Sequence, residues 1–224
     1  MNGCESLRRP LALAFLPALL WASPVLAGNS DEIRIGAAMN HSLGRGLAAN
    51  FGLQGRFTGG SDRIGAVRIG GGLDWKLGGI TLGAGYDASI SRPAGQPDRT
   101  THRVYEQLGL PLGSLAGFHL DSRTRLEQRF GDHGSSQRLR QRLRLVAPLG
   151  DSGRLRAFVS GEALLLLRGD RDSSSGLEQM RGVAGLQLPL GNRLAFEASY
   201  MKRVVYAGRD RFDDVLDFSL TTNF

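Results

Sequence analysis

Residues 118–149 read FHLDSRTRLEQRFGDHGSSQRLRQRLRLVAPL, and this stretch decides the fold. Apolar and charged side chains alternate along it with a period of two, which is the pattern of β-strands with one face in an apolar environment. A polar break at residues 131–136 divides the stretch into two strands. The apolar parity consists of Phe118, Leu120, Leu126 and Phe130, followed by Leu139, Leu143, Leu145, Ala147 and Leu149. The other parity is rich in arginine.

The same alternation continues on both sides of this stretch, in segments bounded by turn residues. Two of them are separated only by Gly78-Gly79, which is a hairpin signal. The apolar parity is clear in residues 47–57, 67–77, 80–90, 104–112, 155–167, 180–190, 194–200 and 216–224.

Three features favour a barrel that spans a membrane. The segments are long, whereas strands of soluble proteins average about five or six residues. No helical pattern follows that could cover their apolar face. Short connections alternate with long polar ones, as periplasmic turns alternate with external loops in outer-membrane proteins. We therefore predict an all-β fold, an antiparallel transmembrane β-barrel of about 10 to 12 strands. The alternative is a soluble periplasmic β-sandwich, in which the apolar parity would be buried against itself.

The number of strands is ambiguous at the N-terminal side. Residues 31–39 also alternate, and counting them gives eleven strands, whereas single-chain bacterial barrels have an even number. Traced back from the C-terminus, this segment would run parallel to the last strand. We favour ten strands, with residues 31–39 as an additional N-terminal segment; a further strand elsewhere would make twelve.

The first 27 residues have the pattern of a cleaved signal peptide. Arg8 and Arg9 precede an apolar run over residues 11–20, and Val25-Leu26-Ala27 supplies small residues before Gly28. The predicted organisation is a signal peptide at 1–27 and a barrel at 28–224, located in the outer membrane of a Gram-negative bacterium after cleavage. Cys4, the single cysteine, leaves with the signal peptide.

The charge composition argues against a nucleic-acid partner. The formal net charge is +7, but the basic residues are interleaved with Asp and Glu along the chain instead of forming a block. The mature histidines, His41, His102, His119 and His133, have no metal-ligand spacing. We expect no cofactor and no metal, and the oligomeric state stays open.

The second half of the chain resembles a bacterial family named domain of unknown function 2490, a set of predicted outer-membrane barrels. The resemblance rests on residues 123–130 (RTRLEQRF), the Arg-rich strand at 138–149, and residues 159–162 (VSGE). It continues in residues 178–181 (EQMR) and in the closing segment 215–224. The resemblance covers residues 103–224 and the front half only loosely. It implies location and fold, and it implies no activity.

The closing segment also matches the signal that the barrel-assembly machinery reads. The matching residues are the terminal aromatic and the apolar residues at alternating positions before it: Leu216, Phe218, Leu220 and Phe224. The expected partners are therefore this machinery and outer-membrane lipid.

The charged parity supplies the candidate functional residues. Arginine facing lipid at the midplane costs roughly 2–4 kcal/mol, so this parity should face the lumen. An arginine ladder favours anions in a pore, while arginines and carboxylates that pair across a narrow lumen would fill it. We favour the filled lumen. The candidate ladder consists of Arg123, Arg125, Glu127, Arg129, Arg138, Arg140, Arg142, Arg144, Glu162, Arg181, Glu197 and Asp217.

The predicted function is that of a non-enzymatic outer-membrane barrel with a structural or small-solute transport role. The alternative is a lipid-modifying hydrolase at the barrel rim, for which His41 beside Ser42 and His133 near Ser135 and Ser136 are candidates. Membrane barrels have girdles of aromatic residues at both interfaces. The residues expected to supply them here are Trp75, Tyr86, Tyr105, Tyr200 and Tyr206.

Overall fold

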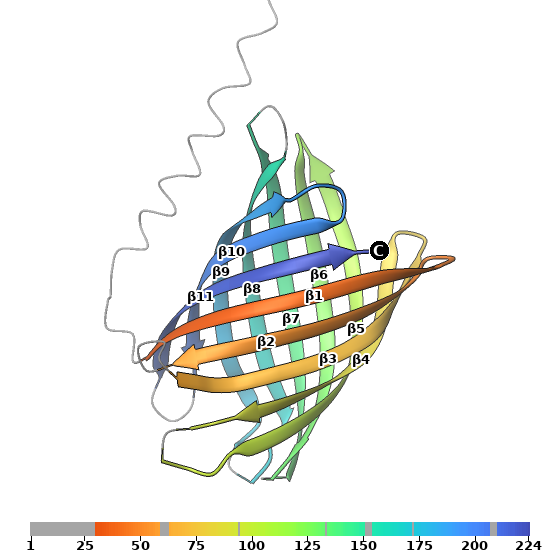
Figure 1. Ribbon diagram of the computed structural model, residues 1–224. Coiled ribbons are helices and arrows are strands. Elements are labelled where there is room, and N and C mark those ends of the chain that lie inside the picture. Colours follow the sequence, from red (N-terminus) through yellow and green to blue (C-terminus); the bar gives the residue numbers. More distant parts are fainter. Residues whose placement is uncertain are drawn as a thin grey trace, which may run out of the picture.

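The protein is a closed barrel of eleven β-strands, shown by a computed structural model in Figure 1. The structure describes residues 30–58, 63–93, 95–132, 134–150, 154–171, 173–206 and 210–224. The signal peptide predicted for residues 1–27 lies outside this range. The strands are β1 (Ser30–Gly44), β2 (Leu47–Thr58), β3 (Arg63–Leu77), β4 (Ile80–Ser91), β5 (Arg99–Leu115), β6 (Phe118–Gly131), β7 (Gly134–Leu149), β8 (Leu155–Arg168), β9 (Gly176–Pro189), β10 (Leu194–Val205) and β11 (Arg211–Asn223).

Consecutive strands pair in antiparallel fashion from β1 to β11, and a single parallel pair closes the ring. In that pair Ser30 lies opposite Asp213 and Asn40 lies opposite Asn223. Beyond the strand end, the backbone N–H of Ser42 donates to the carbonyl of Phe224 at 2.9 Å. Figure 1 shows β1 lying between β11 and β2 in this seam.

The parallel seam corrects the preferred count of ten strands. Residues 31–39 are part of β1, a full barrel strand, so the count is eleven. The expectation that this segment runs parallel to the last strand is confirmed. The rule of even numbers reflects closure by an antiparallel pair, whereas here β1 and β11 point in the same direction and still exchange backbone hydrogen bonds. Closure therefore leaves no open sheet edge.

The connections fall at two ends of the barrel. Pairs of strands are joined by short turns at residues 45–46, 78–79 and 116–117, and by longer connections at 92–98, 169–175 and 206–210. The connection between β6 and β7 is only two residues, because the strands extend into the segment 131–136 that the sequence suggested as a loop. Both β1 and β11 start at the end with the longer connections.

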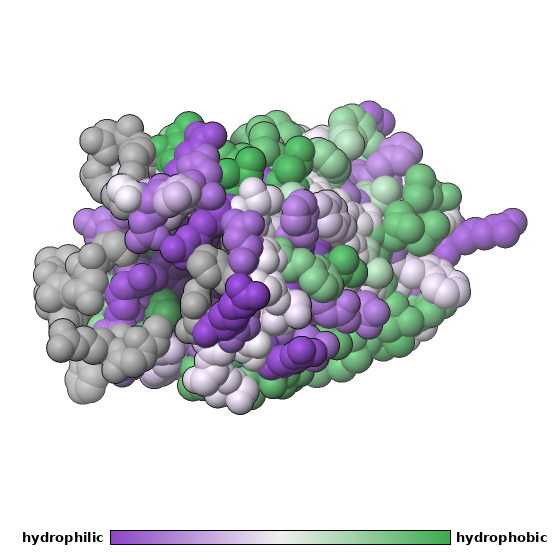
Figure 2. Space-filling view, turned by 90° about the horizontal axis from the view of Figure 1, so that it is seen from below, coloured by the Kyte–Doolittle hydropathy of each residue, from purple (hydrophilic) through white to green (hydrophobic). Residues whose placement is uncertain are grey.

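The alternation of the sequence decides which face each side chain occupies. Ile69, Leu73 and Trp75 on β3 are exposed on the outer face, while their neighbours on the strand point into the barrel. Figure 2 shows hydrophobic residues, in green, gathered along the flanks of the body. Among the described residues, no helix is long and apolar enough to cross a membrane.

Candidate functional site

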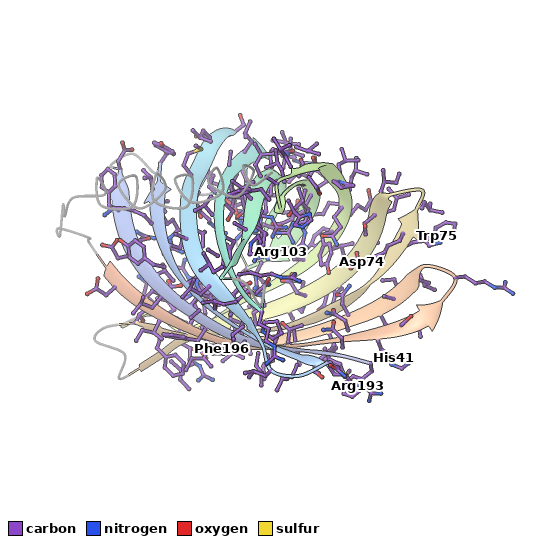
Figure 3. The ribbon with its side chains drawn as sticks, turned by 90° about the horizontal axis from the view of Figure 1, so that it is seen from above. His41, Asp74, Trp75, Arg103, Arg193 and Phe196 are labelled. Carbon is purple, nitrogen blue, oxygen red and sulfur yellow. The ribbon has the colours of Figure 1, made fainter. Side chains whose placement is uncertain are left out.

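Charged side chains fill much of the barrel interior. Figure 3, seen along the barrel from above, shows Arg103 and Asp74 inside the ring of strands and Trp75 and Phe196 outside it. The twelve residues of the predicted ladder all belong to the parity that points inward. They come mainly from β6 to β9, where arginine and glutamate occupy neighbouring positions in the register.

Glu127 on β6 is the centre of the first group of ion pairs. Its carboxylate has no exposed surface. It accepts two hydrogen bonds from Arg138 on β7, at 2.6 and 2.9 Å, and one from Arg140 at 2.8 Å. Arg103 on β5 lies 3.5 Å away. Three guanidinium groups from two strands therefore surround one carboxylate, an arrangement that a low-dielectric interior makes strong.

Glu162 on β8 is the centre of a second group. Arg140 donates to both of its carboxylate oxygens, at 2.8 and 3.0 Å, and Arg181 on β9 donates at 3.1 Å. Arg123 approaches to 3.8 Å. Because Arg140 also binds Glu127, the two groups form one network that cross-links β6, β7, β8 and β9.

The remaining ladder residues lie around this network without joining its centre. Arg144 pairs with Glu197 at 2.8 Å, and Arg142 pairs with Asp121 at 3.3 Å. Arg129 reaches Glu178, a carboxylate that the sequence analysis did not select, at 3.8 Å. Asp217, on β11, is separate from these pairs and accepts a hydrogen bond from Gln54 at 3.4 Å.

Sequence reasoning missed a second buried cluster beside the parallel seam. Glu32 on β1 pairs with Arg34, with Arg56 at 3.2 Å and with Arg203 at 3.3 Å. Arg203 also binds the buried Asp213 at 2.6 Å. The signal was available, since Glu32 and Arg34 have the parity opposite to Ile33 and Ile35, but residues 31–39 were not expected to be a barrel strand.

Two aromatic rings are packed between glycine and arginine inside the barrel. The ring of Tyr105 lies over β4, where an added Cβ at Gly85 would clash with its hydroxyl, and Arg125 stacks on the ring at 4.0 Å. Phe158 is held in the same way between Gly185 and Arg144, with the guanidinium carbon 3.9 Å from the ring centroid. Tyr105 is thus a buried lumen residue and not part of an interfacial girdle. Its parity, opposite to Val104, could have shown this.

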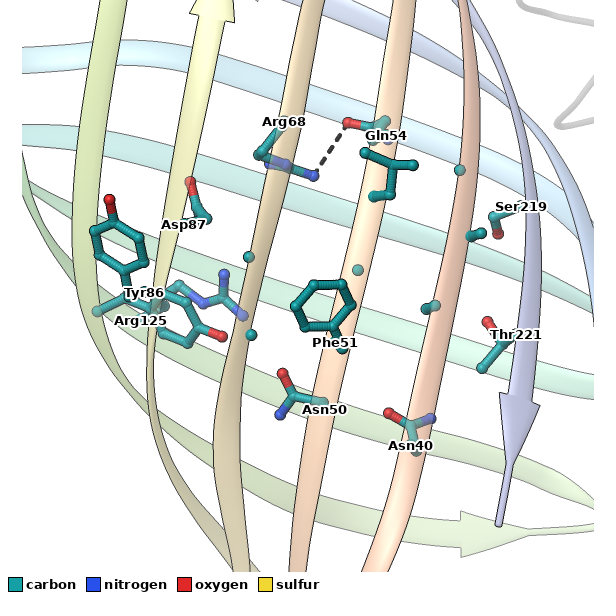
Figure 4. A pocket seen from close by; sticks show the side chains of 18 residues that line it. Asn40, Asn50, Phe51, Gln54, Arg68, Tyr86, Asp87, Arg125, Ser219 and Thr221 are labelled. Atoms are coloured by element: carbon teal, nitrogen blue, oxygen red, sulfur yellow. Dashed lines mark hydrogen bonds between the residues drawn. The ribbon is translucent and has the colours of Figure 1, made fainter.

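A cavity of about 290 Å³ lies against the inner wall formed by β1 to β4. Its wall includes Gly36 and Gly52, where an added Cβ would meet only ordinary contacts of 3.5 Å or more. Arg68 and Arg125 point toward it, as Figure 4 shows. Arg68 donates to Gln54 at 3.1 Å and Arg125 donates to Gln107 at 2.6 Å. Among the described residues, neither guanidinium has a carboxylate within 4 Å.

Further cavities lie toward the two ends of the barrel. One of about 550 Å³ adjoins the short turn at residues 78–79 and is lined by Arg123 and Arg142. Another of about 410 Å³ lies near the longer connections and is lined by Arg56, Arg203 and Arg211. Each cavity therefore has arginines in its wall.

The histidines provide little support for a hydrolase. His41 is exposed on the outer face of β1, and the next residue, Ser42, points inward because strand neighbours alternate. His133 lies outside the described residues. His119 shares a 2.7 Å hydrogen bond through Nδ1 with Ser114, in the exposed hairpin between β5 and β6. The described part of the chain contains no group of three His, Cys, Asp or Glu side chains that could hold a metal.

The closing residues of β11 lie on the outer face. Leu216, Phe218 and Leu220 are exposed at alternating positions, and Phe224 follows them. Phe218 stacks on Phe196 of β10 with the ring centroids 6.5 Å apart.

These features define a closed β-barrel with an apolar outer face and a charged lumen. Residues 35–213 match the family model described as "Protein of unknown function (DUF2490)", and the chain belongs to this family. An uncharacterized protein of Methylorubrum extorquens is 24% identical over 212 residues, covering 92% of this chain and 87% of that protein. Among solved structures, an anion-selective porin from Comamonas acidovorans covers 81% of this chain at 14% identity and a TM-score of 0.39. The chain spans 54% of that porin's length.

Proposed function

We propose that this protein is a non-enzymatic barrel of the Gram-negative outer membrane whose lumen admits small anionic solutes along one wall. The observation that carries the proposal is the pair Arg68 and Arg125, which face the cavity beside β1 to β4 without a carboxylate partner within 4 Å in the described chain. The arginines that surround Glu127 and Glu162, among them Arg138 and Arg140, are paired with these carboxylates and have a structural role.

The apolar outer face of the barrel supports the proposed location in the outer membrane. Leucines such as Leu53, Leu73 and Leu143 are about half exposed there, and in lipid this exposure is favourable. Because the ring is closed, every strand has two neighbours, which satisfies the backbone groups that lipid cannot. The short turns are then periplasmic and the longer connections external.

The charge of the walls supports anions over cations. Glu127 and Glu162 are each surrounded by arginines and have little exposed surface left to attract a cation. Arg68, Arg123 and Arg125 have only distant or neutral partners. Rings and rows of arginine favour anions in pores, since a small anion replaces part of its hydration shell with N–H donors.

The test is conductance of the purified barrel in planar lipid bilayers, with a salt gradient to measure ion selectivity. We expect small conductance steps that favour chloride over potassium. Substituting Arg68→Glu together with Arg125→Glu should shift the reversal potential toward cations. The matched control is Arg193→Glu, in the exposed turn between β9 and β10, which should leave the reversal potential unchanged. Complete absence of conductance would instead favour a filled, structural barrel.

A lipid-modifying hydrolase is the second candidate, and the hydrogen bond between Ser114 and His119 is the observation in its favour. The pair is exposed. A catalytic triad also needs a third group that orients the imidazole, and the nearby Asp121 does not fill this role because its carboxylate is bound to Arg142. Release of fatty acid from phospholipid vesicles by the purified protein, lost in Ser114→Ala, would replace our proposal with this one.

A further inference from the structure

The outer face of the barrel carries polar side chains along one stripe. This polar stripe crosses three adjacent strands, β5, β6 and β7, and its residues share the outward parity of their leucine neighbours: Glu106, Ser122, Thr124, Gln128, Gln137 and Gln141. On β8 and β9, the next strands, the outward positions are leucine, valine, alanine, glycine and methionine. The stripe is therefore a local departure from the apolar surface.

Glu106 is the charged member of the stripe. Its register partners, Ala84 on β4 and Leu126 on β6, both face outward, and its neighbours Tyr105 and Gln107 face the lumen. The carboxylate is exposed near the middle of β5. In the described part of the chain it has no hydrogen-bond or ion-pair partner. A carboxylate facing the hydrocarbon region without a partner is strongly disfavoured.

One pair of outward charges on the opposite side of the barrel is arranged differently. Lys202 on β10 and Asp214 on β11 face outward beside each other and pair at 3.4 Å, and Tyr200 also donates to Asp214. These residues neutralise one another within one chain. Among the described residues Glu106 has no such neighbour, which leaves a second molecule as the source of a partner.

The amides of the stripe provide suitable donors. Gln141 is held in place, since it accepts a hydrogen bond from Thr124 at 2.6 Å and donates to Ser122 at 2.7 Å. Gln128 and Gln137 are opposite each other in the register of β6 and β7. The stripe thus has a carboxylate, which only accepts, on one side of β6 and amide groups, which donate, on the other.

We propose that the polar stripe is the contact face between two copies of this barrel. A two-fold axis along the membrane normal, passing between the two copies of Leu126, places β5 of each copy against β7 of the other at the same height. Leu139 is the register neighbour of Leu126 on β7, and Gln137 and Gln141 flank it on the outer face. Because the strands are tilted, the residue of β7 at the height of Glu106 lies to one side of Leu139 along the strand. An amide lies on each side, so the carboxylate of Glu106 in one copy meets Gln137 or Gln141 of the second copy.

A two-fold interface fits this arrangement because the same surface must serve both sides. An isologous contact needs a patch that is complementary to itself, and acceptor and donor on opposite sides of β6 satisfy this. Within a bilayer, lipid tails compete poorly for polar groups, so hydrogen bonds between polar side chains hold membrane segments together. This inference depends on the membrane location proposed above and is independent of whether the lumen conducts.

The test is the mass of the purified full chain in detergent, measured by light scattering or native mass spectrometry. We expect a dimer, and Glu106→Leu should convert it largely to monomer while keeping the mobility shift on boiling that marks a folded barrel. Glu106→Gln, which keeps a hydrogen-bonding side chain, should retain part of the dimer. The matched control is His41→Leu, an outward polar position on β1, which should leave the mass unchanged.

A second measurement locates the face directly. In a Cys4→Ser background, Leu126→Cys should form a disulfide-linked dimer in membranes under mild oxidation, and Leu216→Cys on β11 should not. A monomeric wild-type protein without Leu126→Cys cross-links would overturn the proposal and assign the stripe to lipid or to a different protein. A dimer that Glu106→Leu leaves intact would overturn it as well. Failure of the anion pathway would appear in the conductance of the Arg68 and Arg125 variants and would leave the mass unchanged.

Discussion

Arg138 and Glu127, on the neighbouring strands β7 and β6, are joined by two hydrogen bonds of 2.6 and 2.9 Å where the Glu127 side chain has no exposed surface. The two residues are direct partners in the strand register. The pairing of two strands thus determines the pairing of two charges. The same carboxylate also forms ion pairs with Arg140 and Arg103. The lumen network is in this sense a product of strand register.

Replacing Glu127 should therefore destabilise the barrel far more than replacing an exposed carboxylate. Glu127→Leu leaves three arginines in the lumen without their shared partner, and breaking a buried ion pair costs about 3–5 kcal/mol. The measurement is urea unfolding in lipid vesicles, followed by tryptophan fluorescence. Asp98→Asn is the control, since Asp98 pairs with Arg92 on the surface and such pairs contribute about 0–1 kcal/mol. Equal losses of unfolding free energy in the two variants would contradict a stabilising role of the ion-pair network around Glu127.

A second prediction concerns two glycines of the barrel, Gly85 on β4 and Gly52 on β2. At Gly85 an added Cβ would come within 2.5 Å of Tyr105 and 2.6 Å of the backbone oxygen of Gly71, so Gly85→Ala should cost about 1–3 kcal/mol through overpacking. At Gly52 an added Cβ meets only one atom, at 3.7 Å, so Gly52→Ala should change stability little. Urea midpoints of the two variants compare them directly, and a larger loss for Gly52→Ala would be inconsistent with this packing.

Much of the fold follows from the sequence because alternation reveals which face a residue occupies. Arg140 and Arg142 lie among Leu139 and Leu143, and the energy of placing arginine in lipid orients the whole sheet. Residues 31–39 showed the same alternation. The rule of even strand numbers outweighed it there, because a sequence pattern does not reveal that the closing pair is parallel.

The candidate site was predictable as a set of residues but not as a set of contacts. Alternation has a period of two and leaves the register between strands undefined, so it could not reveal that Glu127 meets Arg138 while Asp217 is distant. The parity of Glu106, shared with Val104 and Leu108, marked it as an outward charge. That signal was available and was not used.

The proposed orientation in the membrane can be checked by labelling. In a Cys4→Ser background, Gln96→Cys lies in the connection between β4 and β5, and Asn192→Cys lies in the turn between β9 and β10. If the longer connections are external, a thiol reagent that does not cross the outer membrane should label only the first variant in intact cells. Both should react after lysis, which serves as the control. Labelling of Asn192→Cys alone in intact cells would reverse the orientation.

The last prediction tests whether solutes pass along the wall formed by β1 to β4 or elsewhere in the lumen. Gly52→Leu projects a side chain into the cavity that Arg68 and Arg125 face, and its backbone position tolerates a Cβ, so the barrel should fold as before. Conductance through the barrel should fall, because the added side chain narrows the cavity between the two arginines and the wall. Gly182→Leu, where an added Cβ meets nothing within 4 Å on the outer face of β9, adds the same bulk outside the barrel and should leave conductance unchanged. If both variants conduct like the wild type, solutes pass elsewhere in the lumen; if only Gly52→Leu is reduced, the wall of β1 to β4 is the route.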